Sequence, residues 1–348
     1  MTVGSSATPL TWVIGRGGLL GRSLETALEK SMGVVMGPDD TGDNRDRVAW
    51  SDSATQLWHP PENFDWSAPS AGAAELRQRA GEFLRLAGDR PWSVAWCAGA
   101  GVTGTSADAL QLELGALRET LEALAAAPHG RDGAFFFASS AGGVYAGVGS
   151  PPYDESSSVR PLAPYGQAKL DAEALVADWS RSSGTPSLIG RISNIYGPGQ
   201  NIEKAQGLIS QICRSHLTGQ PLSIYVSLDT LRDYLFAPDC AGLIVAGLAR
   251  LRQEQSVTQP SVITKILASQ RAITIGAVLG EMRRLFKRSP RVVLGASPLS
   301  AAQVRDLSLR SRVWPDLDRR TLTPFPVGVA STAADLLRRL QAGGLAGR

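Results

Sequence analysis

Two pieces of the sequence decide the fold: FFFASSAGGVY, which runs from Phe135 to Tyr145, and PYGQAK, which runs from Pro164 to Lys169. The apolar run of the first piece predicts a buried strand that ends at the serine pair Ser139-Ser140. If the second piece begins a helix, Tyr165 and Lys169 lie one turn apart on one face. Because a nearby ammonium favours the charged form of a phenol, this pair predicts a tyrosinate base that works near neutral pH.

A second pattern lies near the start of the chain. A short apolar strand that ends at Ile14 is followed by glycines at three-residue spacing, Gly15, Gly18 and Gly21, and then by leucines with a helical period. Glycines at such a turn let the backbone approach a pyrophosphate, which lies at the positive N-terminus of the following helix. The pattern therefore predicts a dinucleotide-binding turn.

Together these motifs resemble the extended short-chain dehydrogenase/reductase family, which includes the NAD-dependent sugar-nucleotide epimerases and dehydratases. Two later stretches resemble the substrate-side signatures of that family: GRISNIYGPGQ, from Gly190 to Gln200, and RDYLFAPD, from Arg232 to Asp239. The resemblance covers most of the chain, with its motifs in the family's order. It implies an α/β fold, namely a Rossmann-like doubly wound parallel sheet with a smaller C-terminal α/β substrate lobe.

The resemblance also implies a division of the chain. Residues 1–190, joined by about 236–262, would form the NAD-binding Rossmann domain. Residues 191–235 and 263–348 would form the substrate-binding lobe. A leucine-rich helix predicted over Ala107–Ala127 would pack against the sheet. In the extended family this helix often pairs with its copy, so we expect a homodimer, with packing inside a monomer as the alternative.

Roles for individual residues follow from the same resemblance. Tyr165 is the expected catalytic base, Lys169 its partner, and Ser140 or Ser139 the hydroxyl that orients the substrate oxygen. The substrate contacts implied are Asn194 and Arg232. The cofactor contacts implied are Gly15, Gly18, Leu19, Leu20, Gly21, Asp39, Ala98, Gly99, Tyr165 and Lys169.

Several of these residues have a structural interpretation as well. Asn194 is also typical of a turn or helix cap. The guanidinium of Arg232 suits a substrate phosphate, but it could instead pair with Asp233. Small residues such as Ala98 and Gly99 are also expected at the end of a buried strand.

The choice between the two serines is open. Family members place the catalytic hydroxyl four residues before the tyrosine that corresponds to Tyr145, and here that position is Ala141. We expect Ser140 to serve, returned to the site by a bulge at Gly142-Gly143, with Ser139 as the alternative.

The identity of the cofactor depends on the second strand, predicted over Gly33–Met36. The acids Asp39 and Asp40 follow it about two residues late, so Asp39 either contacts the adenosine ribose or belongs to a Pro-Asp turn. Carboxylates there would repel a 2′-phosphate, which favours NAD. Arg16, inside the glycine turn, keeps NADP open.

The reaction is indicated by the residues that follow the serines. The 4,6-dehydratases that the chain resembles place an Asp-Glu pair there, and the 3,5-epimerising members place a Cys. This chain has Ala141-Gly142-Gly143. The sequence therefore favours a 4-epimerase of a nucleotide sugar that passes through a 4-keto intermediate. The alternatives are an NAD(P)-dependent reductase or dehydrogenase of a sugar nucleotide and a non-catalytic nucleotide-binding regulator on the same fold.

Composition excludes other classes of function. The formal charge is +3 over 348 residues and the arginines are scattered, which does not suggest a nucleic-acid surface. The chain has no signal-peptide pattern and no apolar run approaching 18 residues, so we expect a cytoplasmic protein without a membrane partner. Neither a disulfide framework nor a metal site is predicted from the three widely spaced cysteines, Cys97, Cys213 and Cys240.

Overall fold

The computed structural model describes residues 8–32, 55–60, 64, 69–99, 101–102, 104–126, 133–203, 207–254, 261–295 and 304–343. The predicted strand Gly33–Met36 and the candidate ribose contact Asp39 lie outside these residues.

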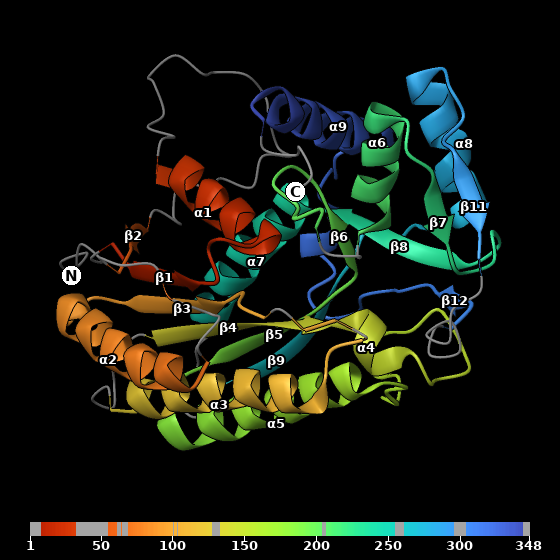
Figure 1. Ribbon diagram of the computed structural model, residues 1–348. Coiled ribbons are helices and arrows are strands. Elements are labelled where there is room, and N and C mark those ends of the chain that lie inside the picture. Colours follow the sequence, from red (N-terminus) through yellow and green to blue (C-terminus); the bar gives the residue numbers. More distant parts are fainter. Residues whose placement is uncertain are drawn as a thin grey trace, which may run out of the picture.

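A six-stranded parallel sheet forms the centre of the molecule (Figure 1). Its spatial order is β2-β1-β3-β4-β5-β9. All residues of β1, β3 and β5 are buried, as expected for a parallel sheet covered on both faces. The strands are β1 (Leu10–Ile14), β2 (Gln56–Trp58), β3 (Trp92–Trp96), β4 (Gly133–Ser140), β5 (Ser187–Ile192) and β9 (Val262–Leu267).

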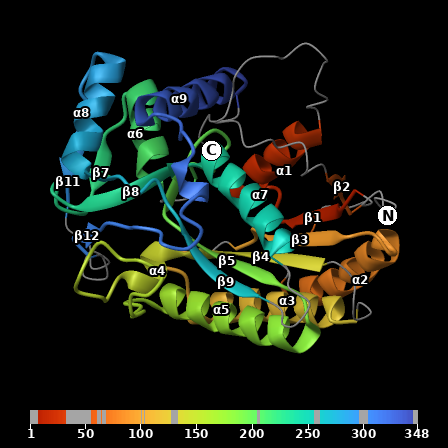
Figure 2. The same ribbon diagram turned by 180° about the vertical axis from the view of Figure 1, so that it is seen from behind.

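Helices cover both faces of this sheet (Figures 1 and 2). One face packs on α2 (Pro69–Ala87), α3 (Ala107–Leu124) and α5 (Pro164–Ser183), and the other on α1 (Leu19–Met32) and α7 (Ala237–Gln253). Alternate side chains of each strand enter opposite clusters, so that Trp12 lies in the first and Val13 in the second. The predicted doubly wound Rossmann-like fold is confirmed.

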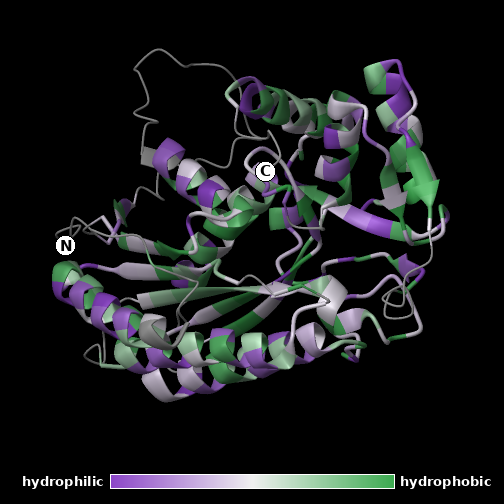
Figure 3. Ribbon diagram, viewed as in Figure 1, coloured by the Kyte–Doolittle hydropathy of each residue, from purple (hydrophilic) through white to green (hydrophobic). Residues whose placement is uncertain are grey.

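The leucine pattern that predicted a helix near Ala107 corresponds to α3. Its N-cap is Ser106, whose side chain accepts a hydrogen bond from the Ala109 N–H. Its buried residues include Leu110, Leu117, Leu121 and Leu124, and the last three of these belong to the core cluster on the sheet. Figure 3 shows the resulting alternation of hydrophobic and hydrophilic residues on the helices around the sheet.

A smaller α/β region lies at one end of the large sheet (Figure 1). Strand β8 is central in it, antiparallel to β10 and parallel to β6 and β12, and β7 pairs with β11. Its core contains Tyr196, Ile212, Met282 and Val329. Its elements are β6 (Asn194–Tyr196), α6 (Leu208–Thr218), β7 (Leu222–Ile224), β8 (Leu231–Phe236), β10 (Ala272–Thr274), α8 (Ile275–Phe286), β11 (Val292–Leu294), β12 (Asp306–Leu307) and α9 (Phe325–Gln341). A 3₁₀ turn (Leu317–Arg319) packs instead against α7 and β9.

The chain leaves the large sheet for the smaller region, returns to it and leaves it again. After β8 it returns through α7 and β9 to the large sheet, which β9 extends as far as Leu267. The C-terminal α9 then contacts the loop after β6, because Asp335 accepts a hydrogen bond from the Gly199 N–H (2.9 Å) and Arg339 donates to the Gln200 carbonyl (2.8 Å).

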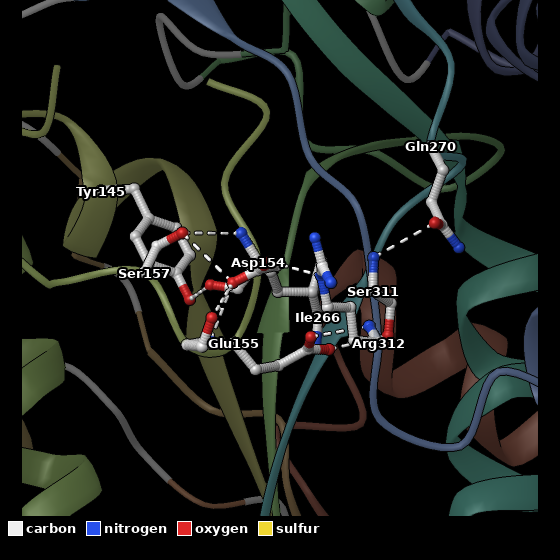
Figure 4. A network of polar contacts seen from close by, with 9 residues as sticks. Tyr145, Asp154, Glu155, Ser157, Ile266, Gln270, Ser311 and Arg312 are labelled. Atoms are coloured by element: carbon white, nitrogen blue, oxygen red, sulfur yellow. Dashed lines mark hydrogen bonds and ion pairs between the residues drawn. The ribbon is translucent and has the colours of Figure 1, made fainter. Parts of the chain in front are cut away.

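The segment between β4 and α5 is held by a polar network (Figure 4). Glu155 accepts hydrogen bonds from the backbone N–H groups of Ile266 on β9 and of Arg312, both at 2.8 Å. Asp154 accepts from the Ser156 hydroxyl at 2.6 Å and forms an ion pair with Arg312. These contacts cover the outer edge of β9.

Among the residues described, no helix is both long enough and apolar enough to cross a lipid bilayer.

Candidate functional site

The turn after β1 requires glycine for steric reasons. Gly15 has a φ of +88°, and a Cβ there would lie 2.5 Å from the backbone nitrogen of Ala98 at the end of β3. A Cβ on Gly21 would overlap the Gly15 carbonyl oxygen. Gly18 donates its N–H to that same oxygen (3.0 Å), and α1 begins at Leu19. The turn therefore packs directly against the residues that follow β3, and the start of α1 packs against the turn.

This arrangement fits the pyrophosphate of a dinucleotide. The first N–H groups of the 14-residue α1 have no acceptor inside the helix, and they carry the positive end of its dipole. The Leu20 side chain is buried in the core, so Leu20 can contribute only its backbone. A Cβ on Gly17 would meet no atom within 4 Å, so the outer side of the turn is open.

The end of β3 leads from this turn towards the catalytic helix. Ala98 is buried beneath Gly15, whereas Gly99 is exposed with a φ of +147°. A Cβ on Gly99 would lie 3.4 Å from Oε2 of Glu113 and 3.8 Å from Nζ of Lys169. The predicted cofactor contacts of the turn, of β3 and of α5 thus lie along one edge of the sheet.

Tyr165 and Lys169 occupy the first two turns of α5, which begins at Pro164. The ammonium of Lys169 donates to the Ala138 carbonyl (3.1 Å) and lies 5.1 Å from the ring centroid of Phe137. It lies 5.8 Å from the ring centroid of Tyr165. A cation fixed to the end of β4 therefore lies beside the phenol.

Glu113 is a residue of this site that sequence reasoning missed. It lines a small pocket of about 30 Å³ together with Ala98, Tyr165 and Lys169, and its Oε1 accepts the Gly101 N–H at 2.9 Å. The sequence shows Glu113 as a carboxylate within a leucine-rich helix, and the structure places its side chain half-buried. Its contact with the loop after β3 depends on tertiary packing, which the helical period does not reveal.

The structure separates the two serines. Ser139 is 4% exposed, and its hydroxyl donates to Oε1 of Glu173 at 2.5 Å. Ser140 is half-buried and caps a short helix, α4 (Ala141–Tyr145), by accepting the Gly143 N–H at 3.1 Å. The bulge expected at Gly142-Gly143 is wrong, because these residues belong to α4. The helix nevertheless brings the Ser140 end of β4 next to Tyr165, since a Cβ on Gly143 would lie 3.2 Å from the Tyr165 ring.

The two predicted substrate contacts lie in the smaller region. Asn194 is exposed and donates its amide to the Asp233 carbonyl at 3.0 Å. Its backbone pairs in register with Tyr234, two residues after Arg232 on β8. Asn194 and Arg232 therefore lie close to one another on the neighbouring strands β6 and β8.

Arg232 is held in partly buried surroundings. It donates to the Leu231 carbonyl (2.8 Å), and burial lowers the pKa of its guanidinium. The next residue, Asp233, faces the opposite side of the strand and accepts hydrogen bonds from the N–H and hydroxyl of Ser269, both at 2.8 Å. The carboxylate of Asp233 is thus hydrogen-bonded to the turn at Ser269.

Comparisons with known proteins bear on the family and the fold. The model of the NAD dependent epimerase/dehydratase family matches residues 11–258. The dTDP-glucose 4,6-dehydratase of Salmonella typhimurium is 36% identical over 91 residues, which are 26% of this chain and 24% of that protein. An uncharacterised UDP-glucose epimerase of Bacillus subtilis is 34% identical over 116 residues, which are 33% of this chain and 35% of that protein. The alignments thus span about a quarter to a third of these curated relatives.

The solved structures extend the likeness over nearly the whole chain. The UDP-glucose 4-epimerase of Thermus thermophilus, solved in complex with NAD, superposes with a TM-score of 0.70 at 18% identity. The match covers 94% of this chain and 99% of that one, which shows a common fold.

Proposed function

The chain belongs to the NAD-dependent epimerase/dehydratase family, and from this premise we propose that it is a 4-epimerase of a nucleotide-activated sugar. The proposal of a 4-epimerase, rather than another member of the family, rests on the composition of α4. Residues 141–143 are Ala-Gly-Gly, and the last of them, Gly143, lies beside Tyr165, so α4 brings no carboxylate to this position. Elimination of water needs an acid and a base, and this segment supplies neither. The segment is therefore compatible with oxidation of one sugar carbon followed by reduction of the same carbon, which is 4-epimerisation.

Each catalytic residue then has one task. Tyr165 removes the proton from the C4 hydroxyl of the sugar and later returns it, acting as general base and general acid in turn. Lys169, held by the Ala138 carbonyl, stabilises the tyrosinate. Ser140, rather than the buried Ser139, orients the substrate oxygen, since its hydroxyl lies at the junction of β4 and α4.

NAD is the proposed cofactor, and the glycine turn with the first turn of α1 is its pyrophosphate site. Gly15, Gly18, Leu19, Leu20 and Gly21 supply this site, and Ala98, Gly99 and Lys169 continue it towards Tyr165. Bound NAD supplies a hydride acceptor and then a hydride donor for the same carbon. Asp39 stays a prediction for the adenosine ribose.

The substrate side is proposed to lie against β6 and β8. Burial lowers the pKa of the Arg232 guanidinium, and a phosphate of the nucleotide beside it would favour its charged form and match its fork geometry. Asn194, exposed beside it, would contact the sugar or the diphosphate.

The experiment is to purify the protein and to incubate it with UDP-, dTDP- and GDP-sugars without added cofactor, with product analysis by chromatography and NMR. An epimerase holds its cofactor through the ketone stage, so acid denaturation should release about one NAD per chain. A 4-epimer should form with no net change in absorbance of reduced nicotinamide.

Other outcomes identify the other members of the family. Purification of an empty protein that consumes NADPH in proportion to product would establish a reductase, which the half-buried Arg16 in the glycine turn would suit. A 4-keto-6-deoxy product would establish a dehydratase. Tight nucleotide binding with no turnover on any sugar would establish a regulator.

We also propose that the protein is a cytoplasmic homodimer that pairs through α3. The outward side of α3 includes Leu112, which is 44% exposed. The expected mass from light scattering is that of two chains, and Leu112→Glu should give a monomer. A monomer in the parent protein would contradict the proposal. In the reducing cytoplasm the three free cysteines stay as thiols.

A further inference from the structure

A single buried carboxylate joins the elements that carry the candidate catalytic residues. Glu173 lies on α5, four residues after Lys169, and is 7% exposed. Its Oε1 accepts hydrogen bonds from the Ser139 hydroxyl (2.5 Å) and from Nε of Arg191 (3.0 Å). Its Oε2 accepts from Nη2 of Arg191 at 2.6 Å. The carboxylate is therefore engaged on both oxygens.

These partners come from the two strands beside the catalytic helix. Ser139 on β4 and Arg191 on β5 lie directly opposite each other in the sheet register. Successive side chains of a strand point to opposite faces, so the residue after Ser139, Ser140, points away from Glu173 towards α4. Fixing Ser139 against α5 thus fixes the position from which Ser140 leaves the strand.

Arg191 extends the connection to α4. Its Nη1 donates to the hydroxyl of Tyr145 at 2.8 Å, and its guanidinium carbon lies 5.3 Å from the centroid of that ring. The Tyr145 hydroxyl in turn donates to the Asp154 carbonyl at 3.0 Å. Burial lowers the pKa of Arg191, but the hydrogen bonds and charge of Glu173 outweigh this effect, and the net shift is upward. The guanidinium therefore stays charged.

The contacts of α4 connect this network to Tyr165. Gly143 of α4 donates to the Ser140 hydroxyl, and its Cα faces the Tyr165 ring. A Cβ on Gly166, the residue after Tyr165, would overlap the Gly143 carbonyl oxygen, so α4 and α5 touch through their backbones. Glu173 is thus connected to Tyr165 through Ser139, the adjoining Ser140 and Gly143.

The network is poorly explained by stability alone. Replacing a buried ion pair with apolar side chains of similar volume is often neutral or stabilising, because desolvation of both charges offsets their attraction. We propose that Glu173 is a positioning residue: acting through Ser139 and Arg191, it sets the Ser140 hydroxyl on β4 relative to the Tyr165 phenol on α5. The inference rests on the proposed function of those two groups.

The test is Glu173→Gln, which keeps the volume and one oxygen acceptor but removes the charge. Because a misplacement of about 1 Å can cost roughly 100-fold in rate, we expect kcat to fall by about 10- to 100-fold. KM and the NAD content should stay within about 2-fold of the parent, since neither Glu173 nor its partners line the glycine turn or β8.

A double-mutant cycle separates positioning from a general loss of stability. In a Ser140→Ala background the group through which Glu173 acts is gone, so adding Glu173→Gln should lower kcat by less than about 3-fold more. The reaction is followed as a single turnover of the bound cofactor. Effects that multiply in full, or an unchanged kcat in Glu173→Gln, would overturn the inference.

Two further variants keep the test decisive. Asp318→Asn breaks another buried ion pair, Lys265–Asp318 (2.8 Å), at the sheet edge on β9, and should lower the unfolding midpoint while kcat stays within about 2-fold. A fall in kcat equal to that of Glu173→Gln would count against positioning.

If Glu173→Gln does not fold, Ser139→Ala removes only the link to β4 and should still lower kcat by about 5-fold or more. An unchanged rate would overturn the inference. Normal turnover in Tyr165→Phe would overturn the proposed function and this inference with it.

Discussion

Gly143 leaves room for the ring of Tyr165: a Cβ on Gly143 would lie 3.2 Å from that ring and 3.3 Å from Cα of Gly166. Such a distance is short for a side-chain contact, so Gly143→Ala should push the ring away from the Ser140 hydroxyl. We expect kcat to fall by about 10-fold or more while the protein stays folded. Gly142→Ala, whose Cβ would meet only the flexible end of Leu307, is the control. Equal rates in both variants would show that the contact is unimportant.

The second prediction concerns the phenol. Tyr165→Phe deletes the proton acceptor and little else, so turnover should fall by about 100-fold or more. The amount of NAD released on acid denaturation should match that of the parent protein. Turnover within a few-fold of the parent would exclude Tyr165 as the base.

A third prediction tests the glycine turn. Gly15→Ala places a Cβ against the Ala98 backbone at a φ of +88°, so the turn must move and the protein should lose bound NAD. We also expect a loss of about 1–3 kcal/mol in the free energy of unfolding. Gly81→Ala in α2, where a Cβ meets no atom within 4 Å, should raise stability by about 0.5–1 kcal/mol and leave the NAD content unchanged. Full NAD content in Gly15→Ala would argue against the turn as the pyrophosphate site.

The fourth prediction concerns Arg232. Lysine keeps the charge but loses the fork geometry that matches a phosphate, so Arg232→Lys should raise KM for the nucleotide sugar about 10-fold. Because the phosphate does not react, kcat should change by less than about 3-fold. Arg271→Lys, an exposed arginine on the neighbouring turn, should leave both constants unchanged. A fall in kcat at unchanged KM would place Arg232 at the reacting centre.

A fifth prediction concerns the pH dependence of stability. The hydrogen bonds from the hydroxyl and the backbone N–H of Ser156, followed by the charge of Arg312, lower the pKa of Asp154 in the folded protein, although burial opposes them. A lowered carboxyl pKa stabilises the folded state above the unfolded value of about 3.9, and this stabilisation is lost as the pH falls. The unfolding midpoint of Asp154→Asn should therefore lie below that of the parent at about pH 6, and the gap should shrink between about pH 5 and 3. A gap that is constant with pH would refute the linkage.

Motifs that depend on local spacing could be predicted from the sequence. Tyr165 and Lys169 are one helical turn apart in any helix, and the glycines at 15 and 21 are required by the turn itself. The sheet and its covering helices follow from apolar periodicity. Strand β2 was missed because its three residues, Gln56–Trp58, carry no repeating pattern, and pairing with β1 alone makes them a strand.

Contacts between distant segments could not be predicted. Glu173, Ser139 and Arg191 have ordinary places in their own elements, and nothing local indicates that they meet. The same holds for Glu113 against Gly101. The sequence also did not reveal that residues 141–145 leave the strand and form a helix, whose N-cap is Ser140.

Strand β9 completes one edge of the large sheet late in the synthesis of the chain. Strand β9 lies next to β5, yet β6, α6, β7, β8 and α7 are synthesised between them. Until residue 267 has left the ribosome, the hydrogen-bonding edge of β5 has no partner strand, and a long unpaired edge is a template for aggregation. Translation that pauses or ends before β9 should therefore yield a product that depends on chaperones, whereas the completed chain closes that edge with its own backbone.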